Sequence, residues 1–178
     1  RPDAERPPLV DWAVAATDGR VPVIVGTGTN NTDQSVAFSE AAVAAGADGL
    51  LVVGPYYNKP SQAGFAAHVE TIAEATDVPI LLYNVPGRTS FNIAPETALH
   101  LAEEVPQVAG IKEASGNVNH LSDLLAHRPD GFGVYAGDDE MALPPIALGG
   151  HGVVSVLSNA VPEPCCDLVR APLARDRA

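Results

Sequence analysis

Lysine is scarce in this 178-residue sequence, which contains only Lys59 and Lys112. Any chemistry that requires a side-chain primary amine therefore has two candidate residues. The two cysteines are adjacent, at positions 165 and 166, a spacing that suits neither a disulfide framework nor a zinc site. A reducing, cytoplasmic setting is the simplest expectation for such a protein.

Basic residues are also few, with 10 Lys and Arg against 22 Asp and Glu, and the formal net charge is −12. A surface this acidic repels nucleic-acid phosphates and anionic lipids, so we expect neither a nucleic acid nor a membrane as partner. No apolar run is long enough to cross a bilayer, and the first residues do not have the character of a signal peptide.

Six short apolar runs, rich in Val, Ile and Leu, divide the chain at intervals. Their lack of polar alternation is typical of strands buried on both faces of a parallel sheet. The runs are Val21–Val25, Leu50–Val53, Pro79–Tyr83, Val108–Lys112, Phe132–Ala136 and Val153–Leu157.

Helical patterns separate these runs. One apolar stripe stops at Gly46, a second follows Ser61 as a candidate N-cap, a third begins near Pro95 in a first helical turn, and a fourth precedes Pro129. The segment from Asp3 to Ala16 also has a helical pattern. Strand–helix repeats without a linker predict a single α/β domain over residues 1–178 with a parallel sheet.

Two α/β architectures compete, an open doubly wound sheet and a (βα)8 TIM barrel. The doubly wound fold would use Gly26 and Gly28 in a dinucleotide-binding loop, but the third glycine is replaced by Asn31. A barrel instead gathers polar residues at the C-terminal ends of its strands. Such residues follow four runs here: 54–58, 83–89, 112–115 and 137–139.

A complete barrel has eight strands and about 250 residues. We therefore expect a partial (βα)-barrel. It contains about six of the eight strand–helix units and lacks the first two. Two open strand edges predict that the chain alone is aggregation-prone and inactive or nearly so. A non-catalytic barrel fragment that only binds or assembles is the alternative.

Lys112 is the leading candidate for chemistry, because its charge ends an apolar strand. Burial there would lower the pKa of the amine, and a neutral amine can attack a ketone to form an imine. The alternative is a lysine that reaches solvent or pairs with Glu113. Lys59 lies in a polar loop before a proline and is expected to be exposed.

Tyr83 ends the preceding strand, so its phenol could lie beside the Lys112 amine and move protons. The alternative is a tyrosine that only packs its ring. Arg88 follows in a Pro-Gly-containing loop, where its guanidinium suits a carboxylate, although the residue taken without context favours a solvated loop arginine.

Tyr56 and Tyr57 are adjacent, and in an extended segment they would face opposite sides, one toward a pocket and one toward a partner chain. The acidic run Asp138–Glu140 is most simply a helix N-cap. The histidines are scattered, so we predict no catalytic metal.

Together these segments resemble the dihydrodipicolinate synthase group of the N-acetylneuraminate lyase family, which are pyruvate-dependent class I aldolases. The resemblance extends from about Asp3 to about Asp167, in the family's order and spacing. The matching stretches are 21–28, 55–60, 82–89, 110–117, 137–139 and 149–156.

The resemblance implies a role for each matching residue. Lys112 corresponds to the lysine that forms a Schiff base with pyruvate, and Tyr83 to the tyrosine of the proton relay. Tyr57 corresponds to the tyrosine that completes a neighbouring active site across a tight-dimer interface. Arg88 corresponds to the arginine that holds the carboxylate of aspartate semialdehyde. Two further positions, Gly137 and Val154, correspond to the lining of the pyruvate pocket.

The implied enzyme is a carbon–oxygen lyase of lysine and diaminopimelate biosynthesis. It condenses pyruvate with L-aspartate 4-semialdehyde to give 4-hydroxy-tetrahydrodipicolinate, uses no cofactor besides the lysine imine, and is a homotetramer of tight dimers. A sibling aldolase acting on N-acetylneuraminate or a keto-deoxy sugar acid is the alternative, and Arg88 is the residue that separates the two.

Two family features differ in this sequence. The Gly-Thr-Thr-Gly-Glu loop, whose threonines bind the pyruvate carboxylate, has no counterpart and is expected before Arg1. In the lysine feedback site, Asn30 and Tyr56 match the family, but the glutamate position is Gln34.

Overall fold

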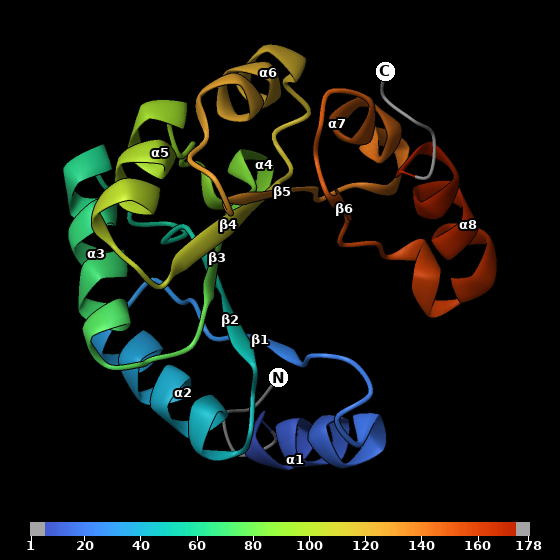
Figure 1. The fold of residues 1–178 in the computed structure, drawn as a ribbon. Helices are drawn as coiled ribbons and strands as arrows, with labels where there is room; N and C mark the ends of the chain where they lie inside the picture. Colours follow the sequence, from blue (N-terminus) through green and yellow to red (C-terminus); the bar gives the residue numbers. More distant parts are fainter. Residues whose placement is uncertain (1–5, 174–178) are drawn as a thin grey trace.

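Six parallel strands form a curved, open sheet in the computed structural model, which describes residues 6–173 (Figure 1). The strands pair in chain order, and each is parallel to the next. A doubly wound sheet reverses its strand order, and this sheet shows no reversal over the described residues. The strands are β1 (Ile24–Gly26), β2 (Gly49–Val53), β3 (Ile80–Asn84), β4 (Val108–Glu113), β5 (Gly133–Ala136) and β6 (Gly152–Val153).

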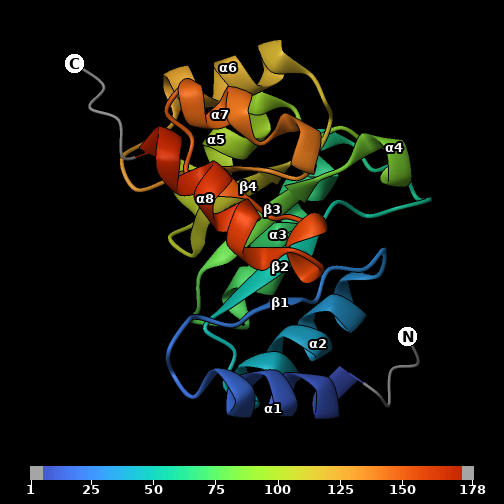
Figure 2. The same cartoon turned by 90° about the vertical axis from the view of Figure 1, so that its right-hand side faces the viewer.

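Helices surround the outside of the curved sheet, so the described part of the chain has the form of a half-barrel (Figure 1). The helices at its two ends, α1 and α8, lie at the two ends of the arc, and Figure 2 shows the same arc from the side on which α8 lies. The helices are α1 (Arg6–Thr17), α2 (Thr32–Ala44), α3 (Gln62–Glu74), α4 (Pro86–Thr89), α5 (Pro95–Glu104), α6 (Val118–His127), α7 (Leu143–Ala147) and α8 (Pro162–Leu173). Two short 3₁₀ turns are η2 (Asp139–Met141) and η3 (Leu157–Asn159). Over these residues every helix is too short or too polar to span a bilayer.

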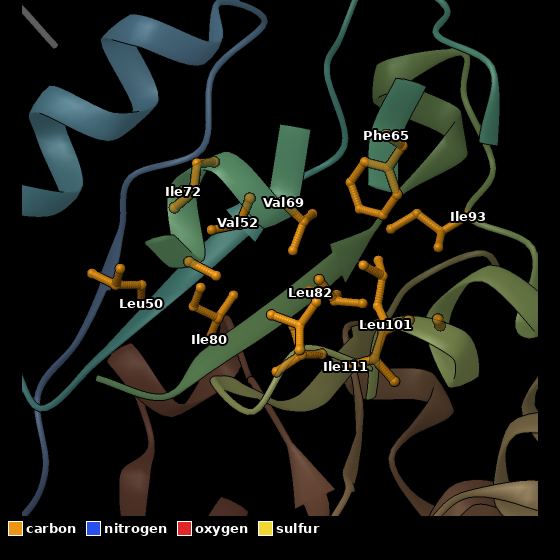
Figure 3. Close-up of a cluster of buried hydrophobic side chains, with 14 of the residues drawn as sticks. Leu50, Val52, Phe65, Val69, Ile72, Ile80, Leu82, Ile93, Leu101 and Ile111 are labelled. Atoms are coloured by element: carbon orange, nitrogen blue, oxygen red, sulfur yellow. The ribbon is translucent and has the colours of Figure 1, made fainter. Parts of the chain in front are cut away.

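The core lies between the convex face of the sheet and the helices. Alternate strand residues, such as Leu50, Leu82 and Ile111, are fully buried there and pack against apolar helix residues such as Phe65 and Leu101 (Figure 3). Successive residues of a strand point to opposite faces, so the residues between them face the concave side. Burial of each large aliphatic side chain stabilises the fold by about 1.5–3 kcal/mol.

Three predicted helix ends are confirmed. The Ser61 hydroxyl accepts a hydrogen bond from the backbone N–H of Gly64 (3.1 Å) and caps α3. Pro95 occupies the first turn of α5, where its missing N–H costs nothing. Gly46 follows the C-cap of α2 with φ +94°, a left-handed conformation that glycine adopts without strain.

The first and last predicted strands are shorter than expected. Regular pairing of β1 begins at Ile24 rather than Val21, because Pro22 has no N–H and the N–H of Val23 donates to the side chain of Asp48 (2.7 Å). The last strand ends at Val153 rather than Leu157. There the carboxylate of Asp139 accepts hydrogen bonds from the backbone of the following loop, which turns into η3.

One local prediction is wrong, and another lies partly outside the described residues. The segment with Tyr56 and Tyr57 is a turn rather than an extended strand, with Tyr57 at φ 72° and the N–H of Asn58 donating to the carbonyl of Tyr56 (2.9 Å). The expected N-terminal helix is confirmed as α1 from Arg6 onward, and the first residues of that prediction lie outside the described range.

The two faces of β3 predict unequal stability effects. Leu82→Ala removes a side chain with no exposed surface and should lower the free energy of unfolding by about 2–5 kcal/mol. Leu81→Ala, the matched control on the half-exposed concave face, should cost clearly less. Urea unfolding with an unchanged m value measures both. Equal losses at the two positions would show that the concave face is also packed.

Candidate active site

A row of four side chains crosses the concave face near the C-terminal ends of the strands. Strand register pairs Val53 with Tyr83, Tyr83 with Lys112, and Lys112 with Tyr135. All four are half-buried, in contrast to the fully buried residues that precede them on the convex face. In a (βα)-barrel this end of the sheet carries the active site.

Lys112 and Tyr83 are in direct contact within this row. The Nζ atom of Lys112 lies 4.0 Å from the centroid of the Tyr83 ring, a cation–π distance. Burial lowers the pKa of the Lys112 amine, and the nearby negative charge of Asp138 acts in the opposite direction. The lowered pKa increases the fraction of neutral, nucleophilic amine at a given pH.

The phenol of Tyr83 is held in its neutral form. Burial raises its pKa, the charge of Asp138 raises it further, and the charge of Arg88 lowers it. A protonated phenol next to an amine nucleophile can donate a proton to a developing alkoxide and accept it back. The prediction that Tyr83 lies beside Lys112 is confirmed as geometry.

Arg88 lies at the rim of this row. It is part of the short helix α4, directly after β3, rather than of an irregular loop. The turn is closed by Ser90 in a left-handed conformation and by the Thr89 hydroxyl, which donates to the carbonyl of Phe91 (2.8 Å). The guanidinium is exposed, and its charge acts on Tyr83, so it can receive an anionic group that approaches the row.

Gly137 joins the end of β5 to β4, and Val154 joins the end of β6 to β5. The N–H of Gly137 donates to the carbonyl of Glu113 (2.7 Å), and the N–H of Val154 donates to the carbonyl of Ala136 (2.9 Å). A Cβ atom at position 137 would lie 2.5 Å from the Cβ of Ala114, so only glycine permits this close approach. The backbone at the end of β5 therefore lies close to the residue that follows β4.

The sequence suggested that the acidic run after β5 caps a helix. Its first side chain does not do so. Asp138 makes no capping hydrogen bond, and its charge acts on Lys112 and Tyr83 instead. Asp139 accepts hydrogen bonds from Val156 and Leu157 (3.1 and 3.0 Å). Hydrogen bonds from the Ser155 side chain and from these two backbone groups lower the pKa of Asp139.

The contact between Lys112 and Tyr83 does not include Tyr57, Tyr56 or Asn30. The turn that carries the two tyrosines is tied to the loop after β1, because the Asn58 side chain donates to the carbonyl of Asn30 (2.7 Å). Tyr57 is 88% exposed, an unusual exposure for a side chain of its size. Lys59 is exposed, as expected.

Within residues 6–173 no group of three or more His, Cys, Asp or Glu side chains is arranged to hold a metal ion. The scattered histidines include His120, whose Nε2 lies 3.3 Å from a carboxylate oxygen of Glu113.

Three residues near the row were missed or misread in the sequence. Tyr135 shares the row with Lys112, and Asp138 follows the adjacent strand; strand alternation and strand ends are the signals that could have revealed them. The third is Glu113. The alternative in which Lys112 pairs with Glu113 is wrong. Glu113 is buried on the opposite face of β4, where it accepts hydrogen bonds from Asn84 and Ser115.

Known proteins resemble this chain in both sequence and fold. The family model described as "Dihydrodipicolinate synthetase family" matches residues 3–177. A 4-hydroxy-tetrahydrodipicolinate synthase from Salinibacter ruber is 78% identical over 98% of this chain, and one from Neisseria meningitidis serogroup B is 49% identical over 98%. A crystal structure of the chloride-inhibited dihydrodipicolinate synthase from Acinetobacter baumannii complexed with pyruvate superposes with a TM-score of 0.93, at 39% identity over 97% of this chain.

The chain spans 58–60% of the length of these relatives. Their six corresponding strands are those of a TIM barrel, as the chain order of parallel strands predicted. The chain belongs to the dihydrodipicolinate synthetase family.

Proposed function

We propose that this chain carries the Schiff-base centre of a 4-hydroxy-tetrahydrodipicolinate synthase, which condenses pyruvate with L-aspartate 4-semialdehyde. The observation that supports this most strongly is the position of the Lys112 amine, 4.0 Å above the Tyr83 ring on the concave face. Of the two lysines only Lys112 is half-buried, and burial lowers the pKa of its amine.

The reaction begins when the neutral Lys112 amine adds to C2 of pyruvate. Tyr83 donates a proton to the carbinolamine oxygen, which leaves as water, and an iminium ion remains. The iminium withdraws electrons from the adjacent methyl group. Loss of one methyl proton then gives an enamine, which is a carbon nucleophile.

The enamine carbon attacks the aldehyde carbon of the semialdehyde, and the aldehyde oxygen takes a proton to become the hydroxyl group. The substrate amine then adds to C2 and displaces the Lys112 amine, which closes the ring. The net reaction joins the two substrates with loss of one water. No oxidant, reductant or cofactor is required, because the imine is the electron sink.

The proposed binding groups lie around the row. Arg88 receives the carboxylate of the semialdehyde, since a permanently charged, planar guanidinium matches a carboxylate. Gly137 and Val154 line the pyruvate site beside Lys112. The relative from Acinetobacter baumannii is described as complexed with pyruvate, which supports pyruvate as a substrate.

We further propose that Tyr57 acts across an interface between copies, in a homotetramer of tight dimers. Its 88% exposure on a turn supports a role outside its own subunit. Tyr56 and Asn30, on the two loops that Asn58 connects, are the proposed contacts for lysine as a feedback inhibitor. The proposed location is the cytoplasm.

Pyruvate trapping tests the imine. Incubation with pyruvate followed by borohydride should leave a reduced adduct on Lys112 alone, mapped by mass spectrometry, because Lys59 is exposed and lacks a neighbouring phenol. Lys59→Arg should retain the adduct and Lys112→Arg should lose it. An adduct on Lys59, or on neither lysine even when the Salinibacter ruber relative supplies the remaining length, would refute the assignment.

The pH dependence of trapping should respond to Asp138. The amine must be neutral to attack, so the rate rises with pH through the pKa of Lys112. The charge of Asp138 raises that pKa. Asp138→Asn should therefore shift the rise to lower pH, whereas Asp130→Asn, an exposed acid before β5, should not. A shift to higher pH, or none, would show that Asp138 does not act on the amine.

Arg88→Ala should spare pyruvate trapping but weaken the use of aspartate semialdehyde. A charge-assisted contact contributes about 1.5–3 kcal/mol, which corresponds to roughly one to two decades in kcat/KM. Because the chain spans 58% of the Salinibacter ruber relative, turnover is measured in a chimera in which that relative supplies the remaining length.

Arg20→Ala is the matched control, since it removes the same charge from the end of α1. Its kcat/KM should equal that of the unaltered chimera. If Arg88→Ala also leaves this value unchanged, Arg88 does not bind the semialdehyde, and a sibling aldolase becomes the better assignment.

A further inference from the structure

We propose that Glu113 is a positioning residue, which holds the ends of β3 and β4 together so that the Lys112 amine stays above Tyr83. The consequence for catalysis rests on the proposed function of Lys112. The geometric part of the proposal does not, because it concerns only how the lysine is held.

Strand register places two residue pairs side by side at the ends of β3 and β4. Tyr83 is paired with Lys112, and the next residues, Asn84 and Glu113, are paired with each other. Since successive residues of a strand point to opposite faces, the Asn84–Glu113 pair lies directly behind the Tyr83–Lys112 pair. Tyr83 and Asn84 are consecutive in β3, and Lys112 and Glu113 are consecutive in β4. A displacement of one pair therefore displaces the other.

The carboxylate of Glu113 is buried and receives several donors. Oε2 accepts a hydrogen bond from Nδ2 of Asn84 (2.9 Å), and Oε1 accepts one from the backbone N–H of Ser115 (2.6 Å). Nε2 of His120 lies 3.3 Å from Oε2, within ion-pair distance but without hydrogen-bond alignment. Glu113 is only 6% exposed. One side chain thus connects β3, the loop after β4, and α6.

Asn84 extends this connection to the segment that follows Arg88. Its Nδ2 also donates to Oδ1 of Asn92 (2.9 Å), and its Oδ1 accepts from the N–H of Ile93 (3.0 Å). The side chain of Gln62 in α3 donates to the carbonyl of Asn92 (2.8 Å). The network therefore fixes both the lysine strand and the segment after α4.

A buried carboxylate is a costly way to join two strands, because its desolvation opposes folding and apolar residues of similar volume often serve as well. What the carboxylate adds is a defined geometry, with two acceptor oxygens and donors from separate elements. Nucleophilic attack depends on such geometry, and a misplacement of about 1 Å can reduce a rate by about 100-fold.

Glu113→Gln separates positioning from packing. Glutamine has nearly the same shape but one acceptor oxygen, so its amide N–H must face either Asn84 or the N–H of Ser115, donor against donor. The double variant Asn84→Asp/Glu113→Gln exchanges donor and acceptor. The new amide donates to the new carboxylate, which still accepts from Ile93, and the new amide oxygen still accepts from Ser115. The exposed side chain of Asn92 must rotate its amide so that Nδ2 rather than Oδ1 faces the new carboxylate.

The first readout needs no substrate. With only two lysines, protein labelled with ¹³C at lysine Cε gives two signals, and Lys59 serves as the reference. Protons above an aromatic face have resonances shifted upfield. In a proton–carbon correlation spectrum, the Cε protons of Lys112 therefore report its contact with Tyr83. Glu113→Gln should move this signal toward that of Lys59, and the double variant should restore it.

The second readout is the rate of borohydride trapping with pyruvate, per folded protein. Glu113→Gln should reduce this rate about tenfold or more, and the double variant should recover most of it. Ser39→Ala is the control, because it removes buried hydrogen bonds to Thr27 and Ser35 in another part of the fold. It should lower the melting temperature and change neither the Lys112 signal nor the rate.

The proposal is overturned if Glu113→Gln behaves like Ser39→Ala, with lower stability but an unchanged Lys112 signal and rate. If Glu113→Gln does not fold, the double variant decides: restored folding, signal and rate support positioning, and their absence contradicts it. If the Lys112 signal responds and is restored, but no lysine of the unaltered chain traps pyruvate, positioning stands and the proposed function fails.

Discussion

The pairing of β3 with β4 is the constraint on which the site depends. Their register shifts by one residue between Ile80 and Leu81, where β4 has an extra residue at Ala109. Because side chains alternate between faces, a shift of one residue exchanges the two faces of a strand. Without this shift Tyr83 would be paired with Ile111, and Lys112 would be paired with Asn84.

This register links three parts of the molecule that serve different purposes. On the convex face Leu82 and Ile111 are fully buried in the core, and beyond them Glu113 and Asn84 form the polar network. On the concave face the half-buried Lys112 contacts Tyr83. Stability and chemistry thus depend on the same two strands, and burial on one face holds the groups on the other.

Much of the fold follows from local pattern, and the rest from contacts between distant residues. The apolar runs predicted the positions of β2 to β5, and the ends of the predicted strands indicated Lys112 and Tyr83. Each of these signals lies within a few consecutive residues. The early end of β6 depends on the Asp139 carboxylate, and the hydrogen bond of Glu113 depends on Asn84, which is 29 residues away in the chain. Neither contact has a local signature, so the sequence pattern alone predicted a longer strand and left the pairing of Lys112 with Glu113 open as an alternative.

A crystal structure of the protein reduced with borohydride in the presence of pyruvate is the most direct measurement. Continuous density from Nζ of Lys112 to C2 of pyruvate is expected, with the Tyr83 hydroxyl within about 2.6–3.2 Å of the adduct and Glu113 still bound to Asn84. An adduct on Lys59, or on Lys112 with the Tyr83 phenol turned away from it, would contradict a centre built on the β3–β4 register.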